Sequence, residues 1–219
     1  MTPTIKICGL STPETVRSAL ENSADMIGFI FFPKSPRNVS IGQAAELRKL
    51  AISKAEAVSV TVDADNAFLD AIVSAMKPDW LQLHGHETPE RVAEVKSLHG
   101  LPVMKAFSIR DAADLAAVAP YQGIADRFLF DAKAPKGSEL PGGNGVSFDW
   151  KLLATLDPGL NYMLSGGLNA GNVGEALAIT HAPGLDISSG VESAPGIKDI
   201  NLINGFFAAV KNARPGAKE

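Results

Sequence analysis

The sequence predicts an α/β protein that folds as a single (β/α)₈ barrel. Short apolar runs alternate with helical stretches from end to end, and there are eight strand-like runs in 219 residues. Repeated strand–helix units imply a parallel sheet with right-handed crossovers, and eight of them fit a small barrel. An open doubly wound sheet is the alternative. It often carries an early Gly-x-Gly-x-x-Gly fingerprint, which is absent after the first strand-like run.

The expected strands are rich in apolar and β-branched residues. They begin near residues 4, 25 and 57 and continue at 79–84, 102–107, 127–131, 161–165 and 184–188. Helices are expected between and after them, at 12–21, 41–50, 66–76, 88–98, 111–118, 147–153, 169–180 and 198–210. The helices 12–21 and 88–98 both open with Thr-Pro-Glu, a capping residue followed by proline at the first helical position.

The chain shows no linker or break in composition, so one domain is expected over residues 1–213. Residues 214–219 are expected to form a disordered tail. Residues 132–145, rich in Gly, Pro and Lys, form a long irregular stretch for a compact barrel. Loops of that length are usually functional, so a lid is expected there.

Composition and charge exclude several classes of partner. The formal net charge is −4 without basic runs, so no nucleic-acid partner is expected. The longest apolar stretch, residues 26–32, is too short to cross a bilayer, and the N-terminus lacks a signal-peptide pattern, so no membrane partner is expected. Cys8 is the single cysteine, which favours a reducing, cytoplasmic setting. No coiled-coil pattern is visible, and a monomer is expected.

Two glycine-rich segments follow the last two strand-like runs. They are Ser165-Gly166-Gly167 and Ser188-Ser189-Gly190, and their first residues are 23 positions apart. Glycine lets backbone N–H groups approach a ligand, and the serine hydroxyls add donors. Such turns between strand and helix suit a phosphate. The alternative is that the glycines only make tight turns. Two such segments on the last two units of a barrel favour a phosphate site.

Side-chain alternation along the strands predicts which groups face the barrel interior. The apolar residues of the first and sixth runs should face the helices, which turns Lys6, Cys8 and Asp131 inward. The same alternation turns four more polar residues inward, namely Gln82, His84, Asp186 and Ser188. Cys8 and Asp131 end their runs at the rim where barrel active sites lie. An acid and a thiol beside a bound phosphate suit acid–base chemistry on a sugar phosphate.

Six motifs along the chain together resemble one family. They are Lys6-Ile7-Cys8-Gly9-Leu10, Phe32-Pro33-Lys34-Ser35-Pro36-Arg37, Gln82-Leu83-His84-Gly85, Leu129-Phe130-Asp131, Leu164-Ser165-Gly166-Gly167-Leu168 and Asp186-Ile187-Ser188-Ser189-Gly190-Val191-Glu192. In this order they resemble the phosphoribosylanthranilate isomerases of tryptophan biosynthesis. The resemblance spans nearly the whole chain, and the combination is specific although each motif alone is weak.

The resemblance implies an Amadori rearrangement that converts N-(5-phosphoribosyl)anthranilate to 1-(2-carboxyphenylamino)-1-deoxyribulose 5-phosphate without metal or cofactor. Asp131 matches the general acid that protonates the furanose oxygen, and Cys8 matches the base that removes the C2 proton. Arg37 matches the residue that holds the anthranilate carboxylate, for which a guanidinium offers a two-pronged edge of N–H donors. The turns containing Gly166, Gly167, Ser188, Ser189 and Gly190 match the phosphate site. His84 is expected beside the substrate, as a structural or substrate-binding residue.

The two reacting groups make specific demands on their surroundings. A carboxylic acid that protonates an ether-like oxygen near neutral pH should be shielded from water, so Asp131 is expected to be at least partly buried. A thiol with an ordinary pKa of about 8.5 is mostly protonated at neutral pH. Cys8 therefore needs nearby positive charge to act as a base, and Lys6 is the candidate.

Departures from the family pattern and alternative functions remain open at this point. The segment Gly142-Gly143-Asn144-Gly145 replaces a usual Gly-Gly-Thr-Gly, which leaves the loop after the sixth strand in doubt. A metal-dependent sugar-phosphate epimerase would need inward His and Asp ligands on several strands, and His84 and His86 alone are too few. A non-catalytic phosphosugar-binding module is the second alternative. Activity on the related histidine-pathway aminoaldose also stays possible.

Overall fold

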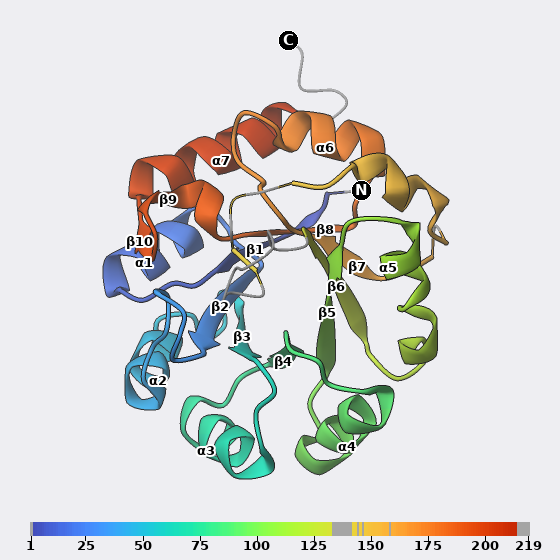
Figure 1. Ribbon diagram of the computed structural model, residues 1–219. Helices are drawn as coiled ribbons and strands as arrows, with labels where there is room; N and C mark the ends of the chain where they lie inside the picture. Colours follow the sequence, from blue (N-terminus) through green and yellow to red (C-terminus); the bar gives the residue numbers. More distant parts are fainter. Residues whose placement is uncertain (1, 133–141, 144, 146, 158, 214–219) are drawn as a thin grey trace.

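The computed structural model describes residues 2–132, 142–143, 145, 147–157 and 159–213. Within them, parallel strands pair in chain order and the last returns to the first, which closes the barrel seen end-on in Figure 1. The strands are β1 (Thr4–Cys8), β2 (Met26–Phe31), β3 (Glu56–Thr61), β4 (Trp80–Leu83), β5 (Val103–Ile109), β6 (Arg127–Ala132), β7 (Tyr162–Leu164) and β8 (Gly184–Ile187). The predicted (β/α)₈ barrel is confirmed, and the open sheet is excluded.

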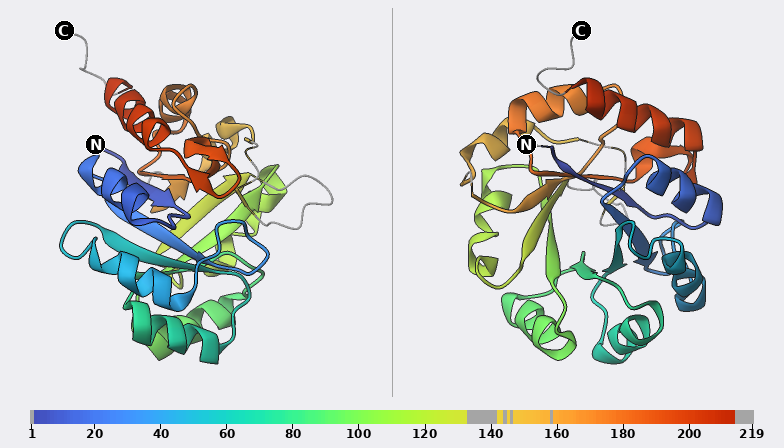
Figure 2. Two further views of the ribbon diagram at one scale, coloured as in Figure 1. Left: turned by 90° about the vertical axis from the view of Figure 1, so that its left-hand side faces the viewer. Right: turned by 180° about the vertical axis from the view of Figure 1, so that it is seen from behind.

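Helices surround the strands on the outside, as Figures 1 and 2 show from three directions. They are α1 (Pro13–Glu21), α2 (Ile41–Lys49), α3 (Asn66–Met76), α4 (Pro89–His99), α5 (Ala112–Ala116), α6 (Val173–Thr180) and α7 (Ile200–Asn212), with the short 3₁₀ turns η1 (Ala119–Tyr121), η2 (Trp150–Thr155) and η3 (Ser189–Val191). The two predicted threonine caps are confirmed. Thr12 and Thr88 accept the backbone N–H groups of Thr15 and Arg91. None of the helices in the described ranges is long and apolar enough to cross a membrane.

Three predicted helices differ in the structure. The stretch 169–180 is helical only from Val173, because residues 170–172 form a turn. The stretch 147–153 is not α-helical but overlaps η2, where the Asp149 carboxylate accepts the N–H of Lys151 and backbone bonds span three residues. The stretch 198–210 begins too early. Lys198 belongs to a small hairpin, β9 (Glu192–Ala194) and β10 (Ile197–Lys198), and α7 starts only after the Asp199 cap. The expected tail 214–219 and most of the expected lid 132–145 lie outside the described residues.

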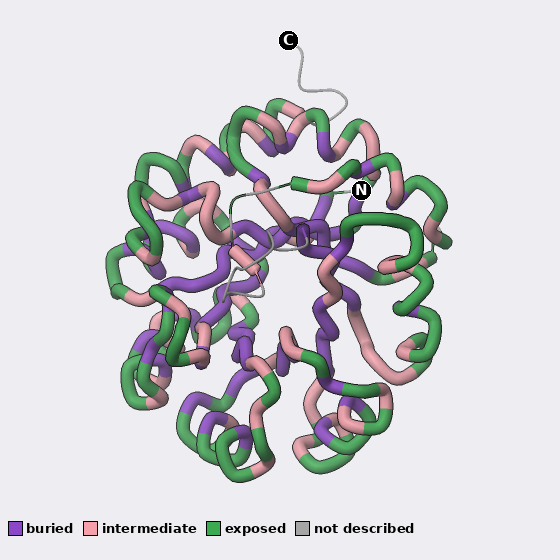
Figure 3. Tube along the Cα trace, in the orientation of Figure 1, coloured by how far each residue is buried: buried purple, intermediate pink, exposed green. Residues whose placement is uncertain are grey.

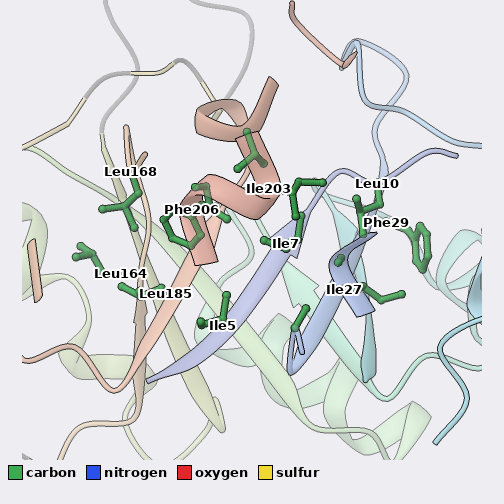
Figure 4. Packing of buried hydrophobic residues seen from close by; sticks show 14 of the residues in the cluster. Ile5, Ile7, Leu10, Ile27, Phe29, Leu164, Leu168, Leu185, Ile203 and Phe206 are labelled. Carbon is green, nitrogen blue, oxygen red and sulfur yellow. The ribbon is translucent and has the colours of Figure 1, made fainter. Parts of the chain in front are cut away.

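The core has two layers because each strand buries both faces. Outward-facing residues such as Ile5 and Ile7 of β1 pack with Ile203 and Phe206 of α7 (Figure 4). A second cluster fills the barrel interior and includes Met26, Val58, Val60, Met104, Leu129 and Met163. Figure 3 shows burial concentrated on the strands and on the inner sides of the helices. Side chains therefore fill the barrel interior, which leaves the rim as the part of the barrel where a ligand can bind.

Candidate active site

A pocket of about 680 Å³, including its open mouth, lies at the carboxyl ends of the strands. Residues from many strands and loops line it, including Cys8, Arg37, Gln82, His84, Asp131, Gly166, Gly167, Asp186, Ser188 and Ser189. All the site residues predicted from the sequence border this one space, except Gly190. The pocket is thus where the structure brings the predicted acid, thiol and glycine turns together.

Cys8 ends β1 on the inner face of the barrel and is 4% exposed. Its neighbour on β2 is Gly28, with which it pairs in the parallel ladder. A Cβ atom at Gly28 would lie 2.9 Å from the Cys8 Sγ and 3.1 Å from the Cε of Lys6. Gly28 therefore makes the space that the thiol and the lysine stem share. Sequence reasoning missed it because a glycine inside a strand carries no chemical signal.

The predicted positive charge is present beside the thiol, but it does not dominate. Burial raises the pKa of Cys8, the ammonium groups of Lys6 and Lys198 act to lower it, and Asp186 raises it; the pKa lies above its ordinary value. Lys6 is fully buried and donates to Asp186 Oδ1 at 2.9 Å. Lys6 thus lies where the expectation put it, but burial of the thiol outweighs the effect of its charge on the pKa of Cys8, and Asp186 opposes that effect as well.

Asp131 lies near the end of β6 and is 4% exposed, as expected for a shielded acid. Its Oδ1 accepts the backbone N–H of Ala132 at 2.9 Å. Its Oδ2 lies 3.6 Å from Nε2 of His84 and next to Gly142. One carboxylate oxygen is therefore anchored by the backbone, and the other borders the pocket.

The two glycine turns differ from the prediction in detail. Gly166 and Gly167 adopt φ angles of +87° and +64°, a conformation that favours glycine at this turn. Gly190 packs against the backbone oxygen of Leu168, where a Cβ atom could not fit. Its missing side chain thus lets the turns after β7 and β8 approach each other, and it does not line the pocket.

Ser188 was expected to offer a hydroxyl donor to phosphate, and the structure places this hydroxyl differently. Its Oγ donates to the Cys8 backbone oxygen at 3.1 Å and accepts from Nζ of Lys198 at 3.1 Å. The hydroxyl therefore ties the end of β8 to the end of β1. The backbone oxygen of Ser188 also accepts from Nζ of Lys198, at 2.9 Å.

Arg37 follows β2 and reaches the small hairpin β9–β10. Its Nε and Nη2 donate to the two carboxylate oxygens of Glu192 at 2.7 and 2.8 Å, and Nη2 also donates to the backbone oxygen of Gly143 at 3.2 Å. The two-pronged edge that was expected to hold a substrate carboxylate is therefore already occupied. Nη1 lies beside Gly143, and Arg37 and Gly143 both line the pocket.

Glu192 also binds Lys198, whose Nζ lies 2.6 Å from Oε1. Burial acts to raise the pKa of Glu192, but hydrogen bonds from Arg37 and the charge of Lys198 outweigh it and hold the pKa below its ordinary value. Burial lowers the pKa of Lys198 below its ordinary value, although Glu192 opposes this. Glu192 closes the motif that began at Asp186, which is the sequence signal that could have identified it.

One side of the pocket is apolar. Ile30 and Phe32, in and after β2, and Val60 and Val62, in and after β3, line it next to Arg37. The glycine turns lie across the pocket, after β7 and β8. The pocket thus has an apolar end beside a guanidinium and a polar end of backbone turns, with Cys8 and Asp131 on strands between them around the ring.

His84 and His86 are not brought together. The His86 side chain is exposed and faces Asp63, whereas Nδ1 of His84 lies 3.0 Å from Nε2 of Gln82 inside the barrel. Within the described ranges, no three His, Cys, Asp or Glu side chains are grouped so that they could hold a metal ion.

A buried ion pair anchors the backbone of the turn that follows His84. Lys105 of β5 donates to Glu87 Oε2 at 3.0 Å and to the backbone oxygen of Gly85 at 2.8 Å. Glu87 in turn accepts the N–H groups of Gly85 and Asp63. Both charged side chains are 3% exposed. This pair fixes the backbone immediately after His84.

The fold and the pocket define a (β/α)₈-barrel enzyme whose polar groups gather at the carboxyl ends of its strands. Residues 5–209 match the profile of the family described as N-(5'-phosphoribosyl)anthranilate (PRA) isomerase. The chain belongs to this family and is an isomerase of tryptophan biosynthesis.

Individual relatives agree with this assignment. An N-(5'-phosphoribosyl)anthranilate isomerase from Brucella canis is 66% identical over 216 residues, which cover 98% of this chain and 97% of the relative. The crystal structure of phosphoribosyl anthranilate isomerase from Thermotoga maritima matches with a TM-score of 0.86 and 30% identity, covering 96% and 99% of the two chains. A phosphoribosyl anthranilate isomerase solved with reduced 1-(o-carboxyphenylamino)-1-deoxyribulose 5-phosphate matches with a TM-score of 0.84 and 28% identity, again covering 96% and 99%.

Proposed function

We propose that this chain converts N-(5'-phosphoribosyl)anthranilate to 1-(2-carboxyphenylamino)-1-deoxyribulose 5-phosphate, with Asp131 as the general acid and Cys8 as the general base. One observation carries the proposal. The two residues end strands of the same barrel and line the same pocket, together with two glycine turns. The family supports the substrate, since its relatives carry the name of this isomerase.

The shape of the pocket supports one orientation of the substrate. The phosphate would bind to backbone N–H groups of the turns at Gly166, Gly167, Ser188 and Ser189, where a multiply charged anion is best accommodated. The anthranilate ring would lie against the apolar side of the pocket. Its carboxylate would then accept hydrogen bonds from Nη1 of Arg37, the guanidinium nitrogen that Glu192 does not bind. The ribose between these two ends would lie between Cys8 and Asp131.

The reaction would begin at the ring oxygen of the ribose. Asp131 gives its proton to that oxygen from Oδ2, the C1–O bond breaks, and the nitrogen lone pair forms a C=N bond. The cationic Schiff base makes the C2 hydrogen acidic. The Cys8 thiolate removes this hydrogen, the C–H electron pair forms a C1=C2 bond, and the C=N electrons return to nitrogen. Tautomerisation of the resulting enolamine moves a proton to C1 and leaves a ketone at C2.

The high pKa of Cys8 is compatible with this step. A buried thiolate is scarce at neutral pH, but it is a stronger base than an ordinary thiolate. The positive charge that develops on the Schiff base lies on the same substrate and favours the thiolate while it is needed.

The test follows the loss of phosphoribosylanthranilate fluorescence with purified enzyme. Cys8→Ala and Asp131→Asn are each expected to lower kcat by about 10²–10⁴-fold, the usual contribution of a general acid or base. Asp157→Asn, a matched change at an exposed turn, should leave kcat unchanged. Full turnover in either of the first two variants would overturn the role of that residue.

Two further measurements check the alternatives that the sequence alone left open. A non-catalytic phosphosugar-binding module would show no turnover in the wild type. A metal-dependent epimerase would bind Zn or Fe in stoichiometric amounts, which metal analysis of the pure protein detects. The histidine-pathway aminoaldose is assayed in parallel, since it undergoes the same rearrangement.

A further inference from the structure

A line of polar side chains crosses the barrel interior and forms part of the pocket lining. Asp186 of β8 accepts from Lys6 of β1 at 2.9 Å, and Lys6 also donates to Gln82 Oε1 of β4 at 2.8 Å. Gln82 Nε2 lies 3.0 Å from His84 Nδ1, and His84 Nε2 lies 3.6 Å from Asp131 Oδ2. The line thus begins beside the thiol and ends at the carboxyl group of the proposed acid.

The chemistry of this line decides where the proton of His84 resides. An ammonium group can only donate, so Lys6 forces the carbonyl oxygen of Gln82 to face it. The amide nitrogen of Gln82 then faces His84, and it too can only donate. Nδ1 of His84 must therefore accept, which places the ring proton on Nε2.

The ionised state of Lys6, on which this argument depends, is supported by its surroundings. Burial acts to lower the pKa of Lys6, but attraction to Asp186 and Cys8 outweighs burial and raises the pKa above its ordinary value. Lys6 is fully buried and therefore has no access to solvent that would let it reorient.

Nε2 of His84 is a buried atom that has no hydrogen-bond partner among the described residues. Burying an N–H group without a hydrogen-bond partner lowers the stability of the folded protein, and such groups are rare in native structures. The carboxylate oxygen of Asp131, 3.6 Å away, is the acceptor that a small movement on substrate binding would bring into range.

We infer that Gln82, held by Lys6, is a positioning residue that locks His84 in the Nε2–H tautomer so that this N–H faces the reacting oxygen of Asp131. The inference rests on the proposed function, in which Asp131 is the general acid. An Nε2–H group cannot accept the proton of Asp131, so that proton is left for the substrate. Once the proton has moved, the same N–H donates to the new carboxylate. The opposite tautomer would present a lone pair and compete with the substrate for the proton.

The first part of the test observes the tautomer directly. The four histidines are labelled with ¹⁵N, and the His84 signals are assigned by their loss in His84→Gln. The wild type is expected to show hydrogen on Nε2 and a bare Nδ1. Gln82→Glu replaces the donor with an acceptor and is expected to move hydrogen onto Nδ1. Gln122→Glu, the same change at an exposed position, should leave the His84 signals unchanged.

The second part measures turnover of phosphoribosylanthranilate. Gln82→Glu is expected to lower kcat by about tenfold or more, a share of the ~10²–10⁴-fold contribution of a general acid, with little change in KM. Gln82→Met, which keeps the length but removes both hydrogen bonds, is expected to populate both tautomers and to lower kcat less. If Gln82→Glu does not fold, Gln82→Met and the wild-type spectrum still decide the question.

The outcomes are distinct. Hydrogen on Nδ1 in the wild type, or a shift of hydrogen in Gln82→Glu with unchanged kcat, would overturn the inference while the isomerase stands. Full turnover in Asp131→Asn would instead overturn the proposed acid. The spectra do not depend on turnover, so they report on Gln82 in either case.

Discussion

Arg37 and Glu192 form a two-pronged ion pair, with Nε–Oε1 and Nη2–Oε2 distances of 2.7 and 2.8 Å, although they are 155 positions apart. Each side chain is 4% exposed. The pair joins the loop after β2 to the hairpin β9–β10. It holds the guanidinium in one orientation at the edge of the pocket, with its two-pronged edge turned to Glu192.

Glu192→Gln is expected to weaken substrate recognition more than chemistry. An amide cannot hold the guanidinium by two charge-assisted hydrogen bonds, so Arg37 loses its fixed orientation. KM should rise by about tenfold, which corresponds to ~1.4 kcal/mol of binding, while kcat changes less. Steady-state kinetics check this, with Glu46→Gln at an exposed ion pair as the control. An unchanged KM would show that Glu192 does not position Arg37.

The same variant is expected to be less stable, with a defined pH dependence. Removing one partner of a buried ion pair typically costs ~3–5 kcal/mol, and here it removes the carboxylate that both Arg37 and Lys198 bind. The pKa of Glu192 in the folded protein lies below its ordinary value. Its stabilisation is therefore fully present above the unfolded pKa of about 4.3 and is lost as pH falls through the folded pKa.

Urea unfolding of the wild type and of Glu192→Gln between about pH 3 and pH 7 measures this effect. The difference in unfolding free energy should be constant near neutral pH and should shrink at the acidic end. A difference in unfolding free energy that grows as pH falls would contradict this prediction, because a carboxylate whose pKa is lowered on folding loses its stabilising effect at low pH.

The thiol of Cys8 is expected to ionise at a higher pH than an ordinary thiol. Burial raises its pKa and outweighs the two nearby ammonium groups. Since Cys8 is the single cysteine of the sequence, the absorbance of thiolate near 240 nm, corrected with Cys8→Ser, follows this group alone. The midpoint should lie above about 8.5.

Asp186→Asn provides a matched test of the charges around the thiol. Asp186 acts to raise the pKa of Cys8 and also neutralises Lys6, so its removal should lower the midpoint of the titration. A midpoint below that of an ordinary thiol in the wild type, or one that rises in Asp186→Asn, would contradict this account of the site.

Gly28→Ala is expected to impair catalysis through steric displacement. The added methyl group would lie 2.9 Å from the Cys8 Sγ, closer than unbonded atoms allow, so the thiol must move. A shift of this size near reacting atoms can cost about 10²-fold in kcat. Gly42→Ala in α2 is the control, because no atom lies within 4 Å of its added Cβ and helix propensity favours alanine. Equal kcat values for the two variants would show that Gly28 does not shape the position of Cys8.

Much of the barrel and of its site could be predicted from the chain because the signals are local. Strand parity placed Lys6, Cys8 and Asp131 inside the barrel, and they are buried there. A threonine before Pro13 and another before Pro89 located two helix starts, since capping depends only on neighbouring backbone. Alternation and capping follow from a few consecutive residues, whatever the rest of the chain does.

Tertiary structure alone decided which partners these residues have. Ser188 was expected to offer its hydroxyl to a phosphate, and it donates instead to Cys8, 180 positions away. The two-pronged edge of Arg37 was assigned to a ligand, and Glu192 occupies it. Closing the barrel brings β8 against β1 and the hairpin against the loop after β2, and these contacts have no counterpart in local sequence. The sequence alone determined the barrel and which side chains of each strand face inward. Ring closure decided which donor meets which acceptor, because only the closed barrel brings these atoms within about 3 Å of each other.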